Sequence, residues 1–316
     1  MESLAHYKLG DRVATDRVAD IYRATDTTLG RTVTIKILRP DVAADAARRD
    51  ALIARARAVL PLSHPNIAAL FHVGEQDGRH FLVFEHTPGE TLRVAVAGSP
   101  LNLHRAVDLG VQIADALADA HGQGFVHGAL NPDSIIVTQK GRVKVLGFGL
   151  PPFPSDQPIQ SDASLSPDDI ECVAPERVLG EGGDGRADVF SLGCVLYEMV
   201  TGRQPFGAAT TSDTAMAILS RTPPPPSQLN ARVPDALDRL VERCLAKSVD
   251  RRCDSAATVA AELRELAAQM EADEKADTRM PLAVRPPRRR RTWLIVLLVL
   301  LCLAGLAAVA AIWLLR

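Results

Sequence analysis

Several patterns that would place this chain in other classes of protein are missing from its sequence. The five cysteines are odd in number and show no C-x-x-C spacing, which argues against a structural zinc site and a disulfide framework. We expect them to be small core residues in a reducing compartment. The net charge of -2 excludes a binder of nucleic acid that depends on overall positive charge. Charged residues make up 23%, so wholesale disorder is not expected.

Two further absences limit the organisation of the chain. Residues 1–20 contain no apolar run, so we expect no secretory signal peptide. The sequence shows no internal repeat. Its 316 residues, 47% of them hydrophobic, are enough for one two-lobed domain or two small ones.

The longest hydrophobic run lies near the C-terminus, at residues 293–315, and carries no charge. About 20 apolar residues suffice for a helix to cross a bilayer. Trp293 and Trp313 lie near its ends, where interfacial anchors are placed. A buried core helix is the alternative, and the basic segment before the run argues against it. We therefore predict a single transmembrane helix, with no folded domain beyond Arg316 and the C-terminus at the outer face of the cytoplasmic membrane.

The segment 271–292 is charged and contains proline, which predicts a juxtamembrane linker. Its arginine run, Arg288–Arg291, should keep the preceding domain in the cytoplasm. Beside a membrane, anionic lipid is a better partner for these arginines than nucleic acid, at about 1 kcal/mol per arginine. A simple topology signal is the alternative interpretation. We expect no nucleic-acid partner.

The rest of the chain changes character near residue 88. Before it, Arg31–Leu38 alternates and predicts a strand, Asp45–Leu60 predicts a helix, and Phe71–Glu85 predicts two strands around a Gln-Asp-Gly turn. After it the pattern is mainly helical, with one hairpin around Lys140–Gly141. The predicted helices cover residues 103–124, 187–202, 235–247 and 255–270.

Eight stretches, read in order and at family spacing, resemble the motifs of bacterial Hanks-type serine/threonine protein kinases. They are VTIK (33–36), SHPNI (63–67), FLVFEHTPGETL (81–92, with Phe84 as gatekeeper), HGALNPDSIIV (127–137), KVLGFG (144–149), APE (174–176), DVFSLG (188–193) and CLAKSVDRR (244–252). The resemblance extends over about residues 7–270. It implies an α+β, two-lobed protein-kinase-like fold, with a β-rich N-lobe over residues 1–86 and a helical C-lobe over residues 87–270.

Kinases of this family cover the nucleotide phosphates with a glycine-rich loop and bind them with a lysine held by a glutamate. The loop aligns with Ala14–Ile21, which contains no glycine. Asp16 stands where a glycine belongs, and its negative charge should repel phosphate oxygens by about 1 kcal/mol or more. Lys36 is retained, but Arg55 occupies the glutamate position. We expect Arg55 to point to solvent, or its helix to swing outward.

The residues that would move the phosphate are also replaced. The resemblance aligns the catalytic aspartate with Ala129, the phosphate-binding lysine with Asn131, and the two metal ligands with Ser134 and Gly147. Alanine and glycine side chains neither accept a proton nor bind magnesium. Asp133 could be nominated as a substitute, but a solvent-facing turn residue after Asn-Pro is the favoured interpretation.

The segment that would position a substrate has changed in the same way. No threonine lies between Gly149 and Ala174, and Asp168–Asp169 replaces the Gly-Thr pair expected before APE. Gly128 replaces the arginine that would hold a phosphorylated segment. A phosphate group on this segment would therefore have no arginine to bind at position 128.

The framework residues of the family are retained. The resemblance implies that His127 and Phe148 belong, with Val59 and Leu70, to the apolar stack joining the lobes. It also implies that Asp188 holds the catalytic-loop backbone and that Glu176 and Arg252 form a buried ion pair. The chemical residues are lost while the structural ones remain, and this separation points to a selected function without catalysis.

Two hypotheses follow. The first is a pseudokinase, a membrane-anchored scaffold or regulatory binding module whose partner is an active kinase or a phosphopeptide-binding domain. The second is a weakly active or atypical serine/threonine kinase that relies on Lys36. We expect no cofactor and no magnesium. If ATP binds at all, it should bind without metal through Ile21, Thr34, Lys36 and the hinge around His86. The oligomeric state is left open.

Overall fold

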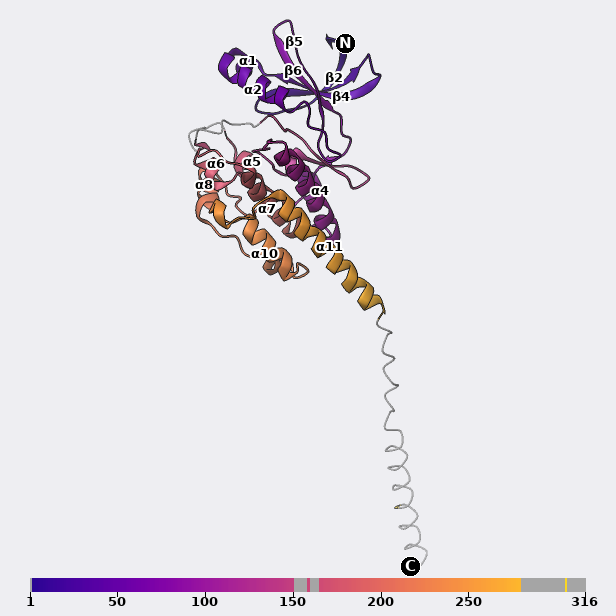
Figure 1. Ribbon diagram of the computed structural model, residues 1–316, viewed down its shortest axis with the longest axis vertical. Coiled ribbons are helices and arrows are strands. Elements are labelled where there is room, and N and C mark those ends of the chain that lie inside the picture. The colour runs from indigo at the N-terminus through magenta and orange to yellow at the C-terminus, as the bar shows by residue number, and fades with distance from the viewer. Residues whose placement is uncertain (1, 151–157, 160–164, 280–304, 306–316) are drawn as a thin grey trace, which may run out of the picture. The chain divides into compact units, whose positions relative to one another are not determined.

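The computed structural model of the protein describes residues 2–150, 158–159, 165–279 and 305. The chain divides into two compact units, Met1–Gln269 and Met270–Arg316. The first unit contains a strand-rich N-lobe and a helical C-lobe, which can be followed in Figure 1. The two-lobed protein-kinase fold predicted from the sequence is confirmed.

The N-lobe is an antiparallel sheet of six strands in the order β1-β2-β3-β4-β6-β5. Its elements are β1 (Ser3–Leu4), β2 (Tyr7–Thr15), β3 (Ala19–Asp26), β4 (Arg31–Leu38), α1 (Pro40–Ala44), α2 (Ala46–Ala58), β5 (Leu70–Gln76) and β6 (Arg79–Glu85). Alternate residues of β4 point into the core, where Val33 and Ile35 are fully buried. Asp45 begins α2 by accepting the backbone N–H of Arg48.

The C-lobe is built around α7 (Gly185–Thr201), whose side chains are buried from Ala187 to Thr201. Gly202 ends this helix in a left-handed conformation that favours glycine. The other elements are β7 (Glu90–Thr91), α3 (Leu92–Val96), α4 (Leu103–Gly122), η1 (Pro132–Ser134), β8 (Ile135–Val137), β9 (Val143–Val145), α5 (Pro167–Ile170), α6 (Pro175–Val178), α8 (Thr211–Ser220), α9 (Pro226–Leu229), α10 (Asp235–Cys244), η3 (Val249–Arg251) and α11 (Ala256–Arg279). Strands β7, β8 and β9 form a second small sheet.

Backbone hydrogen bonds join the two lobes between α2 and β5. The N–H of Ala68 donates to the carbonyl of Val145, and the N–H of Val145 donates to the carbonyl of Asn66, at 2.9 and 2.8 Å. Beside them, Lys144 of β9 lies 2.7 Å from Glu85 at the end of β6. This junction fixes the N-lobe against the loops of the C-lobe that carry the candidate site.

The last predicted helix, residues 255–270, extends further along the chain than expected. The linker predicted from residue 271 is helical as far as Arg279, because α11 continues through this segment. Alanine, glutamate and lysine favour helix, and Glu271 pairs with Lys275 one turn later at 3.2 Å.

The predicted transmembrane segment, residues 293–315, lies outside the described residues except for Gly305. Among the helices that the structure does describe, none combines the length and apolar character that crossing a bilayer requires.

Candidate functional site

The loop from His127 to Ser134 is the catalytic loop of the kinase fold, and Asp188 of α7 holds its backbone. The fully buried carboxylate accepts the N–H of His127 at 2.8 Å and that of Gly128 at 2.7 Å. His121 of α4 contacts the same carboxylate at 2.8 Å. The role predicted for Asp188 is therefore seen in its contacts.

His127 is a packed core residue. Burial lowers the pKa of its imidazole, which favours the neutral ring. Its Nε2–H donates to the Leu146 carbonyl at 2.8 Å, while Nδ1 faces the N–H of Ala129. The ring meets Phe148 edge to face, with centroids 4.8 Å apart. Val59 and Leu70 are buried as well, as their predicted place in the stack requires.

The methyl group of Ala129 lies at the position of the catalytic base. Asn131 and Ser134, at the positions of the phosphate lysine and a metal ligand, bond to each other instead. Asn131 Oδ1 accepts the Ser134 N–H at 2.9 Å, and Ser134 Oγ accepts the Asn131 N–H at 3.0 Å. This reciprocal cap starts η1 and occupies both side chains with local structure. Gly147, at the second metal position, has φ +91°, a conformation that L side chains rarely adopt.

Asp133 does not substitute for the missing base, because its carboxylate faces Arg93 of α3. The Arg93 guanidinium lies 3.2 Å from Asp133 and 2.8 Å from Glu198, and it also contacts Glu171. Burial raises the pKa of Glu171 to about 7, against the opposing effect of the Arg93 guanidinium, and the neighbouring Glu198 carboxylate adds to the rise. This cluster of Arg93 and three carboxylates was not predicted from the sequence. Its three carboxylates come from η1, the segment before α6, and α7, and no local pattern links them.

Lys36, the nucleotide lysine of the family, is paired with a carboxylate from the same lobe. Its Nζ lies 2.8 Å from Oδ2 of Asp16, in the turn between β2 and β3. The other oxygen of Asp16 accepts the N–H groups of Val18 and Ala19, at 2.9 and 2.8 Å. Asp16 was expected only to repel phosphate. It also forms an ion pair with Lys36, and the sequence pattern did not predict that contact.

Arg55 is exposed on α2, so the first of the two outcomes expected for it is confirmed. Lys36 therefore has neither a glutamate nor a repelling arginine at close range. The ion pair that normally joins the helix to the strand has been replaced by one that joins the turn to the strand.

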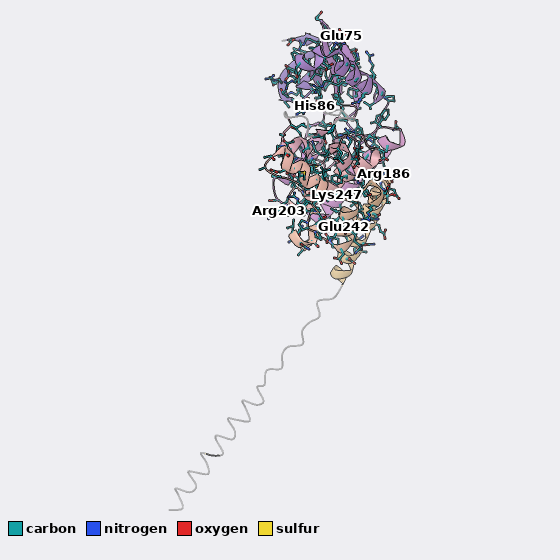
Figure 2. All side chains as sticks on the ribbon, turned by 90° about the vertical axis from the view of Figure 1, so that its left-hand side faces the viewer. Glu75, His86, Arg186, Arg203, Glu242 and Lys247 are labelled. Atoms are coloured by element: carbon teal, nitrogen blue, oxygen red, sulfur yellow. The ribbon has the colours of Figure 1, made fainter. Side chains whose placement is uncertain are left out.

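A second internal contact lies at the hinge, between two residues that were predicted to face a nucleotide. Thr34 Oγ1 lies 3.1 Å from Nδ1 of His86, so two of the residues predicted to face an adenine bond to each other. Ile21 is half-buried above them. Figure 2 shows His86 at the level where the strand-rich and helical lobes meet.

The segment ahead of α6 is held by contacts of its own. Arg17, next to Asp16, lies 3.8 Å from Asp169 of α5, which joins the lobes across the cleft. Arg177 of α6 lies flat against Gly128, and a Cβ added to that glycine would lie 3.4 Å from its Nη2. The space beside the lost arginine is therefore filled by an arginine from another element. The Glu176–Arg252 pair predicted from the family is present, with two bonds of 2.8 and 3.0 Å.

The described part of the chain contains no group of three or more His, Cys, Asp or Glu side chains that could hold a metal ion. The acids near the cleft are engaged elsewhere: Asp16 with Lys36, Asp133 with Arg93, and Asp169 with Arg17.

Comparison with known proteins agrees with this architecture. The chain is 33% identical over 270 residues to the serine/threonine-protein kinase PknB of Mycolicibacterium smegmatis, covering 81% of this chain and 42% of that protein. It is 31% identical over 248 residues to PrkC of Bacillus subtilis, covering 78% of this chain and 38% of that protein. The chain thus spans about two fifths of the length of these relatives.

Among solved structures, the PknI kinase domain of Mycobacterium tuberculosis is similar with a TM-score of 0.67 and 22% identity. The match covers 84% of this chain and 97% of that domain, and at this identity it supports the fold. The family model described as protein kinase domain matches residues 7–263. The chain therefore belongs to the protein kinase family, with bacterial serine/threonine kinases of the PknB type as its relatives.

Proposed function

We propose that this member of the family is a pseudokinase, a membrane-anchored scaffold or regulatory module that transfers no phosphate. The observation that carries the proposal is the replacement of the reacting residues together with the pairing of the retained lysine. Ala129, Ser134 and Gly147 stand at the positions of the base and the metal ligands, and Asp16 neutralises Lys36. Phosphoryl transfer depends on positioned charges, and the charges that would perform it are absent or paired.

The same contacts support a fold that closes without a nucleotide or a metal. Asp16 supplies one negative charge to Lys36 where the family uses nucleotide phosphates, and Arg17 joins the turn to Asp169. The proposal therefore includes no required cofactor. A nucleotide that used Lys36 as the family does would compete with Asp16 for the ammonium group.

Residues 293–315 and the arginine run before them support a single-pass anchor in the cytoplasmic membrane, with the kinase-like domain on the cytoplasmic side. Confinement to a membrane raises the local concentration of a partner anchored in the same membrane. An active kinase or a phosphopeptide-binding domain is the partner class we propose, and anionic lipid is the partner of the arginine run.

The first test is phosphate transfer from labelled ATP by the purified full-length chain, with magnesium and a general protein substrate. We expect no transfer above the level of the Lys36→Met variant. Transfer that Lys36→Met abolishes would overturn the proposal and favour the alternative, a weakly active or atypical serine/threonine kinase.

A second test separates binding from transfer. A ligand present at 100 times its dissociation constant should stabilise the fold by about 2.7 kcal/mol. We expect thermal unfolding with ATP to show no shift that depends on magnesium. A magnesium-dependent shift would show that a metal site exists after all. Partners would be identified by a pull-down of the anchored protein from detergent extracts.

A further inference from the structure

All four cysteines that the structure describes are buried and free of disulfides. They lie as two pairs, Cys172 with Cys194 and Cys244 with Cys253, and the second pair lies beside the loop that carries Arg252. Cys244 is the last residue of α10, and Cys253 lies in the turn before α11. Their Sγ atoms are 3.9 Å apart, and their exposed fractions are 0% and 4%. A disulfide has an S–S distance of about 2.05 Å, so the two sulfur atoms lie within about 2 Å of bonding distance.

The two thiols differ in their surroundings. The Cys244 thiol donates to the sulfur of Cys253, and this bond together with the Arg243 guanidinium lowers the pKa of Cys253 despite its burial. The same bond and complete burial raise the pKa of Cys244. Cys253 therefore has the greater thiolate character, and Cys244 is positioned behind it.

The packing around Cys244 indicates which of the two cysteines is held in place when the sulfur atoms approach each other. A Cβ built on Gly193 of α7 would lie only 2.7 Å from Cys244 Cβ, so α10 is pressed against α7 at this point. Cys253 lies in the irregular segment from Arg252 to Ser255, between the short η3 and α11. We therefore expect Cys253, and not Cys244, to move when the two sulfur atoms approach each other.

We propose that Cys244 and Cys253 are a redox pair that forms a reversible disulfide when the protein meets a hydroperoxide. The Cys253 thiolate attacks the peroxide oxygen, takes up one oxygen atom to become a sulfenic acid, and releases an alcohol or water. The Cys244 thiol then attacks that sulfur, the S–S bond forms, and the hydroxyl leaves as water. Two thiols lose two electrons in total, and one peroxide gains them.

The position of the pair connects it to the ion pair of the C-lobe. Arg252 directly precedes Cys253, and its guanidinium binds Glu176 of α6 and the carbonyls of Ala246 and Lys247. A disulfide between Cys244 and Cys253 would close a small ring that contains Ala246, Lys247 and Arg252. Oxidation therefore fastens the loop that presents Arg252 to Glu176, whether or not the cleft is catalytically silent.

The full-length chain allows a direct test by peptide mapping. Trypsin cleaves after Arg243, Lys247, Arg252 and Arg264, which places the two cysteines in separate peptides, Cys244–Lys247 and Cys253–Arg264. After treatment with hydrogen peroxide and alkylation of remaining thiols, we expect these two peptides as one linked species that a reductant separates. Cys244→Ser and Cys253→Ser should each abolish the link, and Cys172→Ser should retain it.

A physical readout accompanies the map. Closing so short a ring should raise the midpoint of thermal unfolding by about 5 °C in the oxidised wild type and leave Cys253→Ser unchanged. Recovery of both peptides in alkylated form after peroxide treatment would overturn the proposal. So would a link through Cys172 or Cys194 that leaves Cys244 and Cys253 free.

Discussion

The carboxylate of Asp16 makes contacts with both of its oxygens, and this explains why an acid is stable in the turn that aligns with the glycine-rich loop of the family. One oxygen accepts two backbone N–H groups and the other meets Lys36. The lysine side chain is only 18% exposed, so part of its charge would otherwise be buried without a partner. Asp16, at a glycine position of the family, thus supplies the negative partner for Lys36. The family takes this partner from the glutamate position, where this chain has Arg55.

Replacing this aspartate with asparagine tests whether its charge keeps nucleotides out. Asp16→Asn retains the shape and an acceptor for the backbone N–H groups but removes the negative charge. Two like charges about 4 Å apart repel by about 1 kcal/mol or more, so ATP without metal should bind at least about fivefold more tightly to the variant. Calorimetric titration measures the difference. Asp20→Asn is the matched control, because Asp20 bonds Thr15 instead of Lys36 and should change affinity less.

The buried carboxylates around Arg93 predict a pH dependence of stability. The pKa of Glu171 is about 7 in the folded protein, against an ordinary value of 4.5. The folded state therefore binds this proton more tightly, and the stabilising contribution is complete below pH 4.5 and is lost as pH rises through about 7. The maximal slope is about 1.4 kcal/mol per pH unit.

The comparison with Glu171→Gln isolates this contribution, because glutamine does not titrate. Urea unfolding at pH 5 and pH 8 should show a larger loss of stability on raising the pH in the wild type than in the variant. Equal losses in both proteins would mean that Glu171 is ionised throughout this range. Since Glu198 is coupled to it, the measured midpoint belongs to the pair.

The missing catalytic groups could be predicted from the sequence, because each replacement concerns a single aligned position. Ala129 and Gly147 needed only the family spacing to be assigned. The replacement partners were not predictable in the same way. The pairs Lys36–Asp16 and Arg93–Glu198 join segments that are distant along the chain, and only their approach in the fold brings the charges together.

At the level of elements, the strongest predictions came from strict periodicity and from glycine stops. The strand Arg31–Leu38 has the predicted bounds, and α7 ends at Gly202 as expected. The extension of α11 beyond its predicted end has a physical cause. A charged segment rich in alanine and glutamate has helix propensity even where no core receives it.

The packing of α7 against α10 predicts a sharp difference between two glycines. A Cβ at Gly193 would lie 2.7 Å from Cys244 Cβ and 3.0 Å from Leu245, so Gly193→Ala should destabilise the fold by about 1–3 kcal/mol. Gly122→Ala, at the end of α4, meets nothing within 4 Å and should be neutral or stabilising by about 0.5 kcal/mol. Urea unfolding of both variants measures this. Similar stabilities would show that α10 can move away from α7.

For the kinase-like domain as a whole, the two lobes are joined by the protein's own groups. The bonds of Asn66 and Ala68 with Val145, the Glu85–Lys144 pair and the Arg17–Asp169 pair all join N-lobe residues to the C-lobe. Exposed pairs contribute little individually, at most about 1 kcal/mol each. The buried backbone bonds and the apolar stack of His127 and Phe148 hold the lobes more firmly. A surface presented by both lobes can therefore be recognised by a partner without a nucleotide.

The proposed membrane attachment can be tested separately from catalysis. The full-length chain, with its charge-free run at 293–315, should float with phosphatidylcholine vesicles after washing at high salt and high pH, because a spanning helix is not held by charge. A chain ending at Thr292 should remain in solution. Replacing Arg288–Arg291 with asparagine in the full-length chain should preserve flotation while reducing added binding to anionic vesicles. Flotation lost in this variant would instead identify the arginine run as the attachment, and residues 293–315 would then require another location.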